Sequence, residues 1–155
     1  METAESTEVY IARASTVDAF DLACLRAASL VEMGVMVPAE RDAFLPRAHR
    51  EFVQLLREER FAAWLLVSGG RPAGCAGVLL WRRIPYPTTS LHAEIAGVYV
   101  DPGLRNRGYA REMVREAISW AHAAEVRRVV LHVNPAARSL YERLGFVDGS
   151  EMRLV

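Results

Sequence analysis

The chain has 155 residues with 19 acidic and 19 basic side chains, and all of the basic residues are arginines. A pyridoxal enzyme needs a lysine for its Schiff base and a Walker A loop contains Gly-Lys-Ser/Thr, so a chain without lysine excludes both chemistries. The formal net charge of zero argues against a nucleic-acid-binding domain, whose surface is normally strongly basic.

The apolar patterns and turn residues predict ten elements in one domain over residues 1–155. In chain order these are a strand at 9–12, helices at 17–31 and 38–60, strands at 61–67, 73–81 and 92–100, a helix at 109–124, a strand at 126–133, a helix at 135–144 and a strand at 146–155. Gly34 and Gly145 are placed to end the first and last helices, and Pro46 limits the regular part of the second. The order β-αα-β-β-β-α-β-α-β predicts an α+β fold, a mixed central sheet flanked by helices, with a right-handed crossover through 109–124.

Residues 1–8 are polar and acidic, which argues against a signal peptide and predicts a flexible N-terminus. No apolar run approaches the roughly 20 residues that a membrane helix needs. Cys24 and Cys75 lie among small apolar neighbours without a CxxC motif, as buried thiols in a reducing compartment do. These features predict a cytoplasmic protein without a membrane partner.

The segment 98–110 carries the clearest chemical signal, because a predicted strand passes there through a loop rich in glycine and arginine to a helix start. The first amides of a helix have no acceptor within it, and the helix dipole adds partial positive charge, so such a junction suits a phosphate. Gly108 lets the backbone approach a ligand, and Arg105 and Arg107 offer charge-assisted contacts. A capped helix with two solvated arginines fits the same residues equally well.

Two motifs resemble those of the GNAT superfamily of N-acetyltransferases. Arg105-x-x-Gly108-x-Ala110 resembles the acyl-CoA signature Gln/Arg-x-x-Gly-x-Gly/Ala, with alanine in place of the commoner glycine. Downstream, residues 134–146 resemble the segment Asn-x-x-Ala-x-x-Leu-Tyr-Glu-x-x-Gly-Phe. Because both motifs occur in the expected order and context, the resemblance extends from residue 95 to residue 146 in detail and to most of the chain in element order.

The resemblance implies that acetyl-CoA lies between the strands 92–100 and 126–133. Val98 and Val100 would then bind the pantetheine arm through their main chain. The pyrophosphate would be held by the loop residues Arg105, Asn106, Arg107, Gly108, Tyr109 and Ala110. No metal is implied, and no histidine has metal-ligand spacing.

Direct attack of an amine on the thioester requires a base, oxyanion stabilisation and an acid for the leaving thiolate. Tyr141 occupies the family's usual general-acid position, although a helical tyrosine packed beside Phe146 would look the same in sequence. Asn134 either contacts the cofactor or caps the last helix. Glu94, eleven residues before Arg105, is the candidate base; the alternatives are an ion pair of Glu94 with a nearby arginine and a water chain as base.

The acceptor site is less defined. His92 is the histidine expected in the cleft, whereas His132 falls at a strand end and receives no role. Trp81 and Tyr86 border the acceptor or simply pack against the hairpin. Residues 1–60 hold 11 acids and 7 arginines, a balance of −4, which favours a cationic acceptor.

The sequence therefore predicts an acetyl-CoA-dependent N-acetyltransferase acting on a primary amine of a small molecule, peptide or protein. The alternative is a non-catalytic acyl-CoA-binding regulator on the same fold. The sequence does not set the oligomeric state, and homodimers are frequent among similar proteins.

Overall fold

The computed structural model describes residues 7–155, so most of the terminus predicted to be flexible lies outside the described residues. The strands are β1 (Val9–Arg13), β2 (Phe61–Ser68), β3 (Arg71–Arg82), β4 (Leu91–Val100) and β5 (Val129–Leu131). The α-helices are α1 (Ala19–Glu32), α2 (Arg41–Arg57), α3 (Tyr109–Ala123) and α4 (Arg138–Arg143). Short 3-10 turns precede α1, α2 and α4, and another, Pro102–Leu104, follows β4.

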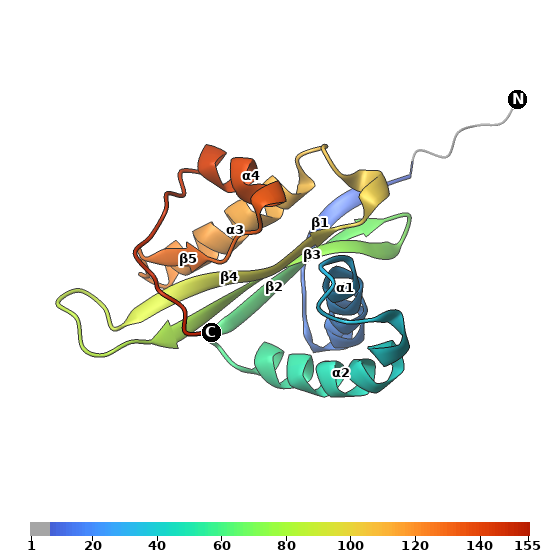
Figure 1. The fold of residues 1–155 in the computed structure, drawn as a ribbon, viewed down its shortest axis with the longest axis horizontal. Coiled ribbons are helices and arrows are strands. Elements are labelled where there is room, and N and C mark those ends of the chain that lie inside the picture. The colour runs from blue at the N-terminus through green and yellow to red at the C-terminus, as the bar shows by residue number, and fades with distance from the viewer. Residues whose placement is uncertain (1–6) are drawn as a thin grey trace, which may run out of the picture.

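The five strands form one sheet in the order β1-β2-β3-β4-β5. The pairs from β1 to β4 are antiparallel, whereas β4 and β5 are parallel and α3 connects them. Figure 1 shows α1 and α2 on one side of the sheet and α3 and α4 on the other. The predicted α+β class, with a mixed sheet flanked by helices, is confirmed.

The sheet separates two apolar layers because strand residues alternate between its faces. In β2, Trp64 and Leu66 pack in the core that includes Met113 of α3, while Ala63 and Leu65 pack with α1 on the opposite face. Both faces of the central strands are therefore covered by helices, and ligand access is left to the edges and strand ends.

Two predicted boundaries change. Helix α2 runs continuously through Pro46, because burial of Leu45 and Ala48 on its apolar face outweighs one missing helical hydrogen bond. Strand β5 is shorter than predicted, because the Val126 amide donates to the Ala121 carbonyl (3.0 Å) and closes the end of α3 instead of pairing in the sheet.

The predicted final strand over residues 146–155 is wrong: the chain after α4 forms no strand within the described residues. Asp148, Gly149 and Ser150 favour turns and interrupt the apolar alternation, so the segment cannot present a continuous face to the sheet. Its side chains Val147, Met152 and Leu154 are exposed. Residues 146–155, here called the C-terminal segment, instead pass beside β5 (Figure 1).

Candidate active site

The parallel strands β4 and β5 stop pairing after a short stretch, and the region where they separate is here called the opening. The two strands pair only from Ala93 opposite Val129 to Ile95 opposite Leu131. Beyond Ile95, Gly97 adopts a left-handed conformation (φ 68°) and the register of β4 against β3 shifts, which marks a β-bulge. A glycine inside a strand pattern is a recognisable signal for such a bulge, and the prediction of a strand over 92–100 did not include it.

The backbone of β4 turns its free groups toward this opening. The Asp101 N–H, at the end of β4, donates to the carbonyl of Ala73 on β3 (2.8 Å). Since successive residues of a strand direct their backbone groups to opposite sides, those of Val98 and Val100 face away from β3. The Val100 carbonyl already accepts from Arg105 Nε (2.8 Å), which leaves the groups of Val98 and the Val100 amide for a ligand.

The loop between β4 and α3 presents a row of free amides. Asn106 (φ 61°) and Gly108 (φ 86°) both adopt the left-handed conformation, and Gly108 is the N-cap of α3. Within residues 7–155, none of the amides from Asn106 to Arg111 has a hydrogen-bond acceptor. Several N–H donors at a helix N-terminus form a set that fits a pyrophosphate.

The Arg105 side chain is engaged elsewhere. Its Nη2 donates to Glu32 Oε2 at the end of α1 (2.6 Å), and its guanidinium carbon lies 5.6 Å from the centre of the Tyr99 ring. The arginine thus ties the loop to α1, and its backbone amide donates to the Pro102 carbonyl (3.4 Å), so Arg105 shapes the loop and leaves the free amides to the residues that follow it. Arg107 is exposed.

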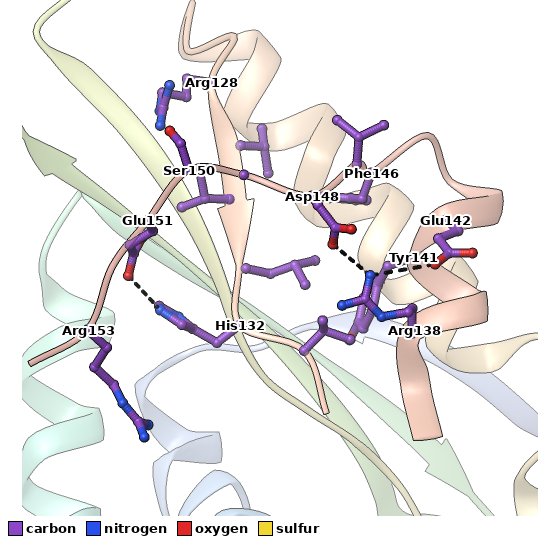
Figure 2. A pocket seen from close by; sticks show the side chains of 16 residues that line it. Arg128, His132, Arg138, Tyr141, Glu142, Phe146, Asp148, Ser150, Glu151 and Arg153 are labelled. Carbon is purple, nitrogen blue, oxygen red and sulfur yellow. Dashed lines mark hydrogen bonds and ion pairs between the residues drawn. The ribbon is translucent and has the colours of Figure 1, made fainter. Parts of the chain in front are cut away.

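Tyr141 lies on α4 with its side chain largely buried. Its ring contacts Phe146 edge-on, with centroids 5.9 Å apart, and it lines a cavity of about 740 Å³ between β5, α4 and the C-terminal segment (Figure 2). Burial raises the pKa of the phenol, so the hydroxyl keeps its proton at neutral pH. Packing and proton donation are therefore compatible for this residue.

Glu94 faces the other side of the sheet, because its neighbours Ala93 and Ile95 belong to the core under α3. Its Oε1 lies 3.0 Å from His132 Nδ1, and the other ring nitrogen of His132 lies 3.1 Å from Glu151 Oε1. Among the described residues, neither Arg82 nor Arg83, the two arginines near Glu94 in the sequence, forms an ion pair with it. The hydrogen bonds to Glu151 and Glu94 raise the pKa of His132, a residue to which the sequence assigned no role.

Comparison with models of known protein families identifies the family of this chain. The sequence model described as the acetyltransferase (GNAT) family matches residues 33–146. The chain belongs to the GNAT family of acetyltransferases. The predicted family and the predicted class, an acetyl-CoA-dependent N-acetyltransferase, are confirmed.

The individual proteins similar to this chain share less than a third of its sequence. The chain is 29% identical to the N-alpha-acetyltransferase RimI of Mycobacterium tuberculosis, over 93% of its own length and 82% of that protein. A predicted acetyltransferase from Clostridium acetobutylicum, solved with acetyl-CoA, superposes with a TM-score of 0.85 at 20% identity and 96% coverage of both chains. An aminoglycoside N-acetyltransferase solved with CoA gives a TM-score of 0.73 at 15% identity, covering 99% of this chain and 97% of that one.

The residues predicted to border the acceptor in this GNAT chain are His92, Trp81 and Tyr86. His92 is buried with both ring nitrogens unpartnered, and it meets Trp81 edge-on with centroids 3.7 Å apart. Burial and the charges of Arg83 and Arg128 lower the pKa of His92, so its ring is neutral at pH 7. Tyr86 is exposed, and the guanidinium carbon of Arg83 lies 4.3 Å from the centre of its ring.

Asn134 has a structural role in the described chain. Its Oδ1 accepts from the Ala137 amide (3.0 Å), which caps the turn before α4. Among residues 7–155, no group of three or more His, Cys, Asp or Glu side chains is arranged to hold a metal ion. No described helix is both long and apolar enough to cross a membrane.

Proposed function

We propose that this GNAT enzyme transfers the acetyl group of acetyl-CoA directly to a primary amine, without an acyl-enzyme intermediate. The observation that carries the proposal is the row of free amides from Asn106 to Arg111, beside the opening between β4 and β5. Those amides would hold the pyrophosphate. Val98 and the Val100 amide would bind the pantetheine arm, which places the thioester near the point where the two strands separate.

Acid and base would work from opposite faces of the sheet. Tyr141, on the α3 side, would give its hydroxyl proton to the departing sulfur. Glu94, on the other face, is the carboxylate proposed to draw a proton away from the amine. This arrangement lets the coenzyme and the acceptor enter from different sides.

The proposed acceptor is a cationic primary amine. Glu94 and Glu151 place two carboxylates around His132 on the acceptor face, and carboxylates attract an ammonium group. The likeness to an N-alpha-acetyltransferase makes a peptide with a free N-terminus the first acceptor to test, and the likeness to an aminoglycoside N-acetyltransferase makes an aminoglycoside the second.

The test measures acetyl-CoA binding by calorimetry and thiol release with each of three amines: a lysine-free peptide, an aminoglycoside and a polyamine. We expect binding and amine-dependent thiol release with at least one of them. Tight binding without thiol release from any amine would favour the regulatory alternative, and failure to bind acetyl-CoA would contradict the proposed cradle. A cytoplasmic location and a homodimer remain predictions.

A further inference from the structure

His132 lies at the point where the catalytic opening begins. It directly follows Leu131, the last residue of β5 that pairs with β4, and its side chain is 72% exposed. The ring is held between two carboxylates from distant parts of the chain, Glu94 on β4 and Glu151 in the C-terminal segment. Figure 2 shows the Glu151 contact beside the cavity that Tyr141 also lines.

The two contacts define the protonation state of the ring. A carboxylate only accepts hydrogen bonds, so each ring nitrogen must carry a hydrogen to bond its partner. A neutral imidazole has only one N–H, so the geometry belongs to the imidazolium form. When the ring loses a proton, one of the two carboxylates loses its donor.

Glu94 and Glu151 differ in how firmly they are held. Glu94 is fixed in a sheet strand and its side chain is 26% exposed, whereas Glu151 is 72% exposed in a segment without secondary structure. The Nδ1–H bond to Glu94 is therefore the one retained in the neutral ring. Nε2 then carries a lone pair that repels the Glu151 carboxylate, so deprotonation releases Glu151 and frees Nε2.

We propose that His132 Nε2 takes the proton from the acceptor ammonium, that Glu94 positions the ring, and that Glu151 covers Nε2 until the ring is neutral. This inference rests on the proposed function and assigns the base within it. Glu94 acts through the histidine and is a positioning residue, while His132 meets the substrate.

The proton balance follows. One ammonium proton passes to Nε2 and then to solvent, and the freed nitrogen lone pair forms the C–N bond to the acetyl carbonyl carbon. The C–S bond breaks, its electron pair leaves with the sulfur, and the Tyr141 hydroxyl supplies the sulfur with a proton. The second proton lost by the nitrogen enters solvent, from which Tyr141 is reprotonated. The products are an N-acetyl amide, CoA thiol and one net proton.

The direction of the pH dependence is set by the charges around the ring. The groups in contact are Glu94 and Glu151; the other charged side chains lining the cavity are Arg128, Arg138, Glu142, Asp148 and Arg153. Arg138 Nη1 lies 2.6 Å from Asp148 Oδ1 and 3.7 Å from Glu142 Oε1, so this arginine is already paired with carboxylates. The two contacting carboxylates raise the pKa of His132, so the active neutral form appears only above that raised pKa.

The same shift determines when the C-terminal segment is held. Folding raises the pKa of His132, so its contact with Glu151 is fully stabilised below the pKa of an unfolded histidine, about 6.5. The stabilisation is lost as the pH rises through the pKa of His132 in the folded protein. The contact is therefore closed in acid and released over the pH range in which the base becomes competent.

The first experiment is an NMR titration of the histidine Cε1 signals in the full chain, with His132 assigned by His132→Gln. We expect His132 to titrate above about 6.5, and Glu151→Gln and Glu94→Gln each to lower that value. A wild-type His132 that titrates at or below 6.5, or that ignores both substitutions, would overturn the proposed cluster without reference to catalysis.

The second experiment measures kcat/KM for thiol release from pH 5 to 9, using the amine that gives the largest wild-type rate. We expect His132→Gln to lower the plateau of kcat/KM by about 10²-fold or more and to remove the fall of kcat/KM at acid pH. We expect Glu151→Gln to move that fall to lower pH. His122→Gln, on the exposed face of α3, is the matched control and should leave the profile unchanged.

The outcomes separate the two proposals. If the wild type releases thiol and His132→Gln keeps both its rate and the fall of kcat/KM at acid pH, the inference fails while the proposed function stands. If the wild type binds acetyl-CoA but acetylates no amine, the proposed function fails and the inference fails with it. Melting temperatures of all variants establish that a lost rate does not arise from unfolding.

Discussion

The role of the Tyr141 hydroxyl can be tested separately from the packing of its ring. The ring packs against Phe146 and belongs to the core beneath α3, so Tyr141→Phe retains the packing and removes only the proton. We expect kcat to fall by about 10²- to 10⁴-fold, with a melting temperature and acetyl-CoA affinity close to those of the wild type. Tyr10→Phe, at an exposed tyrosine of β1, is the control, and equal rates in the two variants would contradict the acid role.

The two cysteines should differ in reactivity. Cys75 is buried beside the bulge, where its Sγ donates to the Gly97 carbonyl (3.2 Å), and burial raises its pKa to about 12. Cys24 is only partly buried. Because the thiolate is the reactive form, we expect Ellman's reagent to modify at most Cys24 in the folded protein at pH 8, and both thiols in urea. Rapid modification of Cys75 in the native state would contradict this packing.

Motif spacing locates single residues better than it locates their partners. Tyr141 and Gly108 are predicted as site residues because each lies in a short contiguous pattern. The role proposed for His132 depends on Glu94 and Glu151, 38 and 19 residues away, and the Arg105 side chain bonds to Glu32, 73 residues away. Such contacts follow from the strand register and the packing of α1, which no local pattern specifies.

At the scale of elements, the junction of β4 and α3 depends on a glycine conformation. Gly108 has φ 86°, and a Cβ built there would meet no atom within 4 Å, so substitution acts through the backbone alone. We expect Gly108→Ala to lower the free energy of unfolding by about 1–2 kcal/mol. Misalignment of one amide, worth about 1 kcal/mol, should also weaken acetyl-CoA binding roughly fivefold.

Gly103→Ala is the matched control for that variant. Gly103 lies in the same loop, its added Cβ also meets open space, and its φ is outside the left-handed region. Calorimetry and urea unfolding should therefore show little change for Gly103→Ala. Equal effects of the two substitutions would mean that the conformation of Gly108 does not organise the amides.

Elements with long periodic patterns were predicted well, and the edge of the sheet was not. Helix α3 lies within one residue of its predicted bounds, because its apolar face repeats over four turns. The final strand failed because a few apolar residues around Asp148-Gly149-Ser150 predict a strand only if a partner edge is available. Whether β5 has free backbone groups for a further strand depends on the arrangement of the whole sheet and is not specified by residues 146–155.

At the scale of the whole molecule, the absence of lysine restricts where the enzyme can label itself. The only amine nitrogen that a lysine-free chain offers for acetylation is its N-terminus, because arginine stays protonated. Any stable acetyl group that appears on another protein in a mixture is therefore easily distinguished from self-acetylation. This makes the enzyme suited to a search for protein acceptors in which its own background is nearly zero.

Prolonged incubation with acetyl-CoA should consequently add at most one hydroxylamine-resistant acetyl group per chain, as read by intact mass. A second adduct that hydroxylamine removes would be a thioester, expected at Cys24 because the Cys75 thiol is buried. Peptide mapping should place the resistant group on the N-terminal residue. A resistant acetyl group elsewhere would contradict this restriction and would direct attention to the arginine side chains as acceptors.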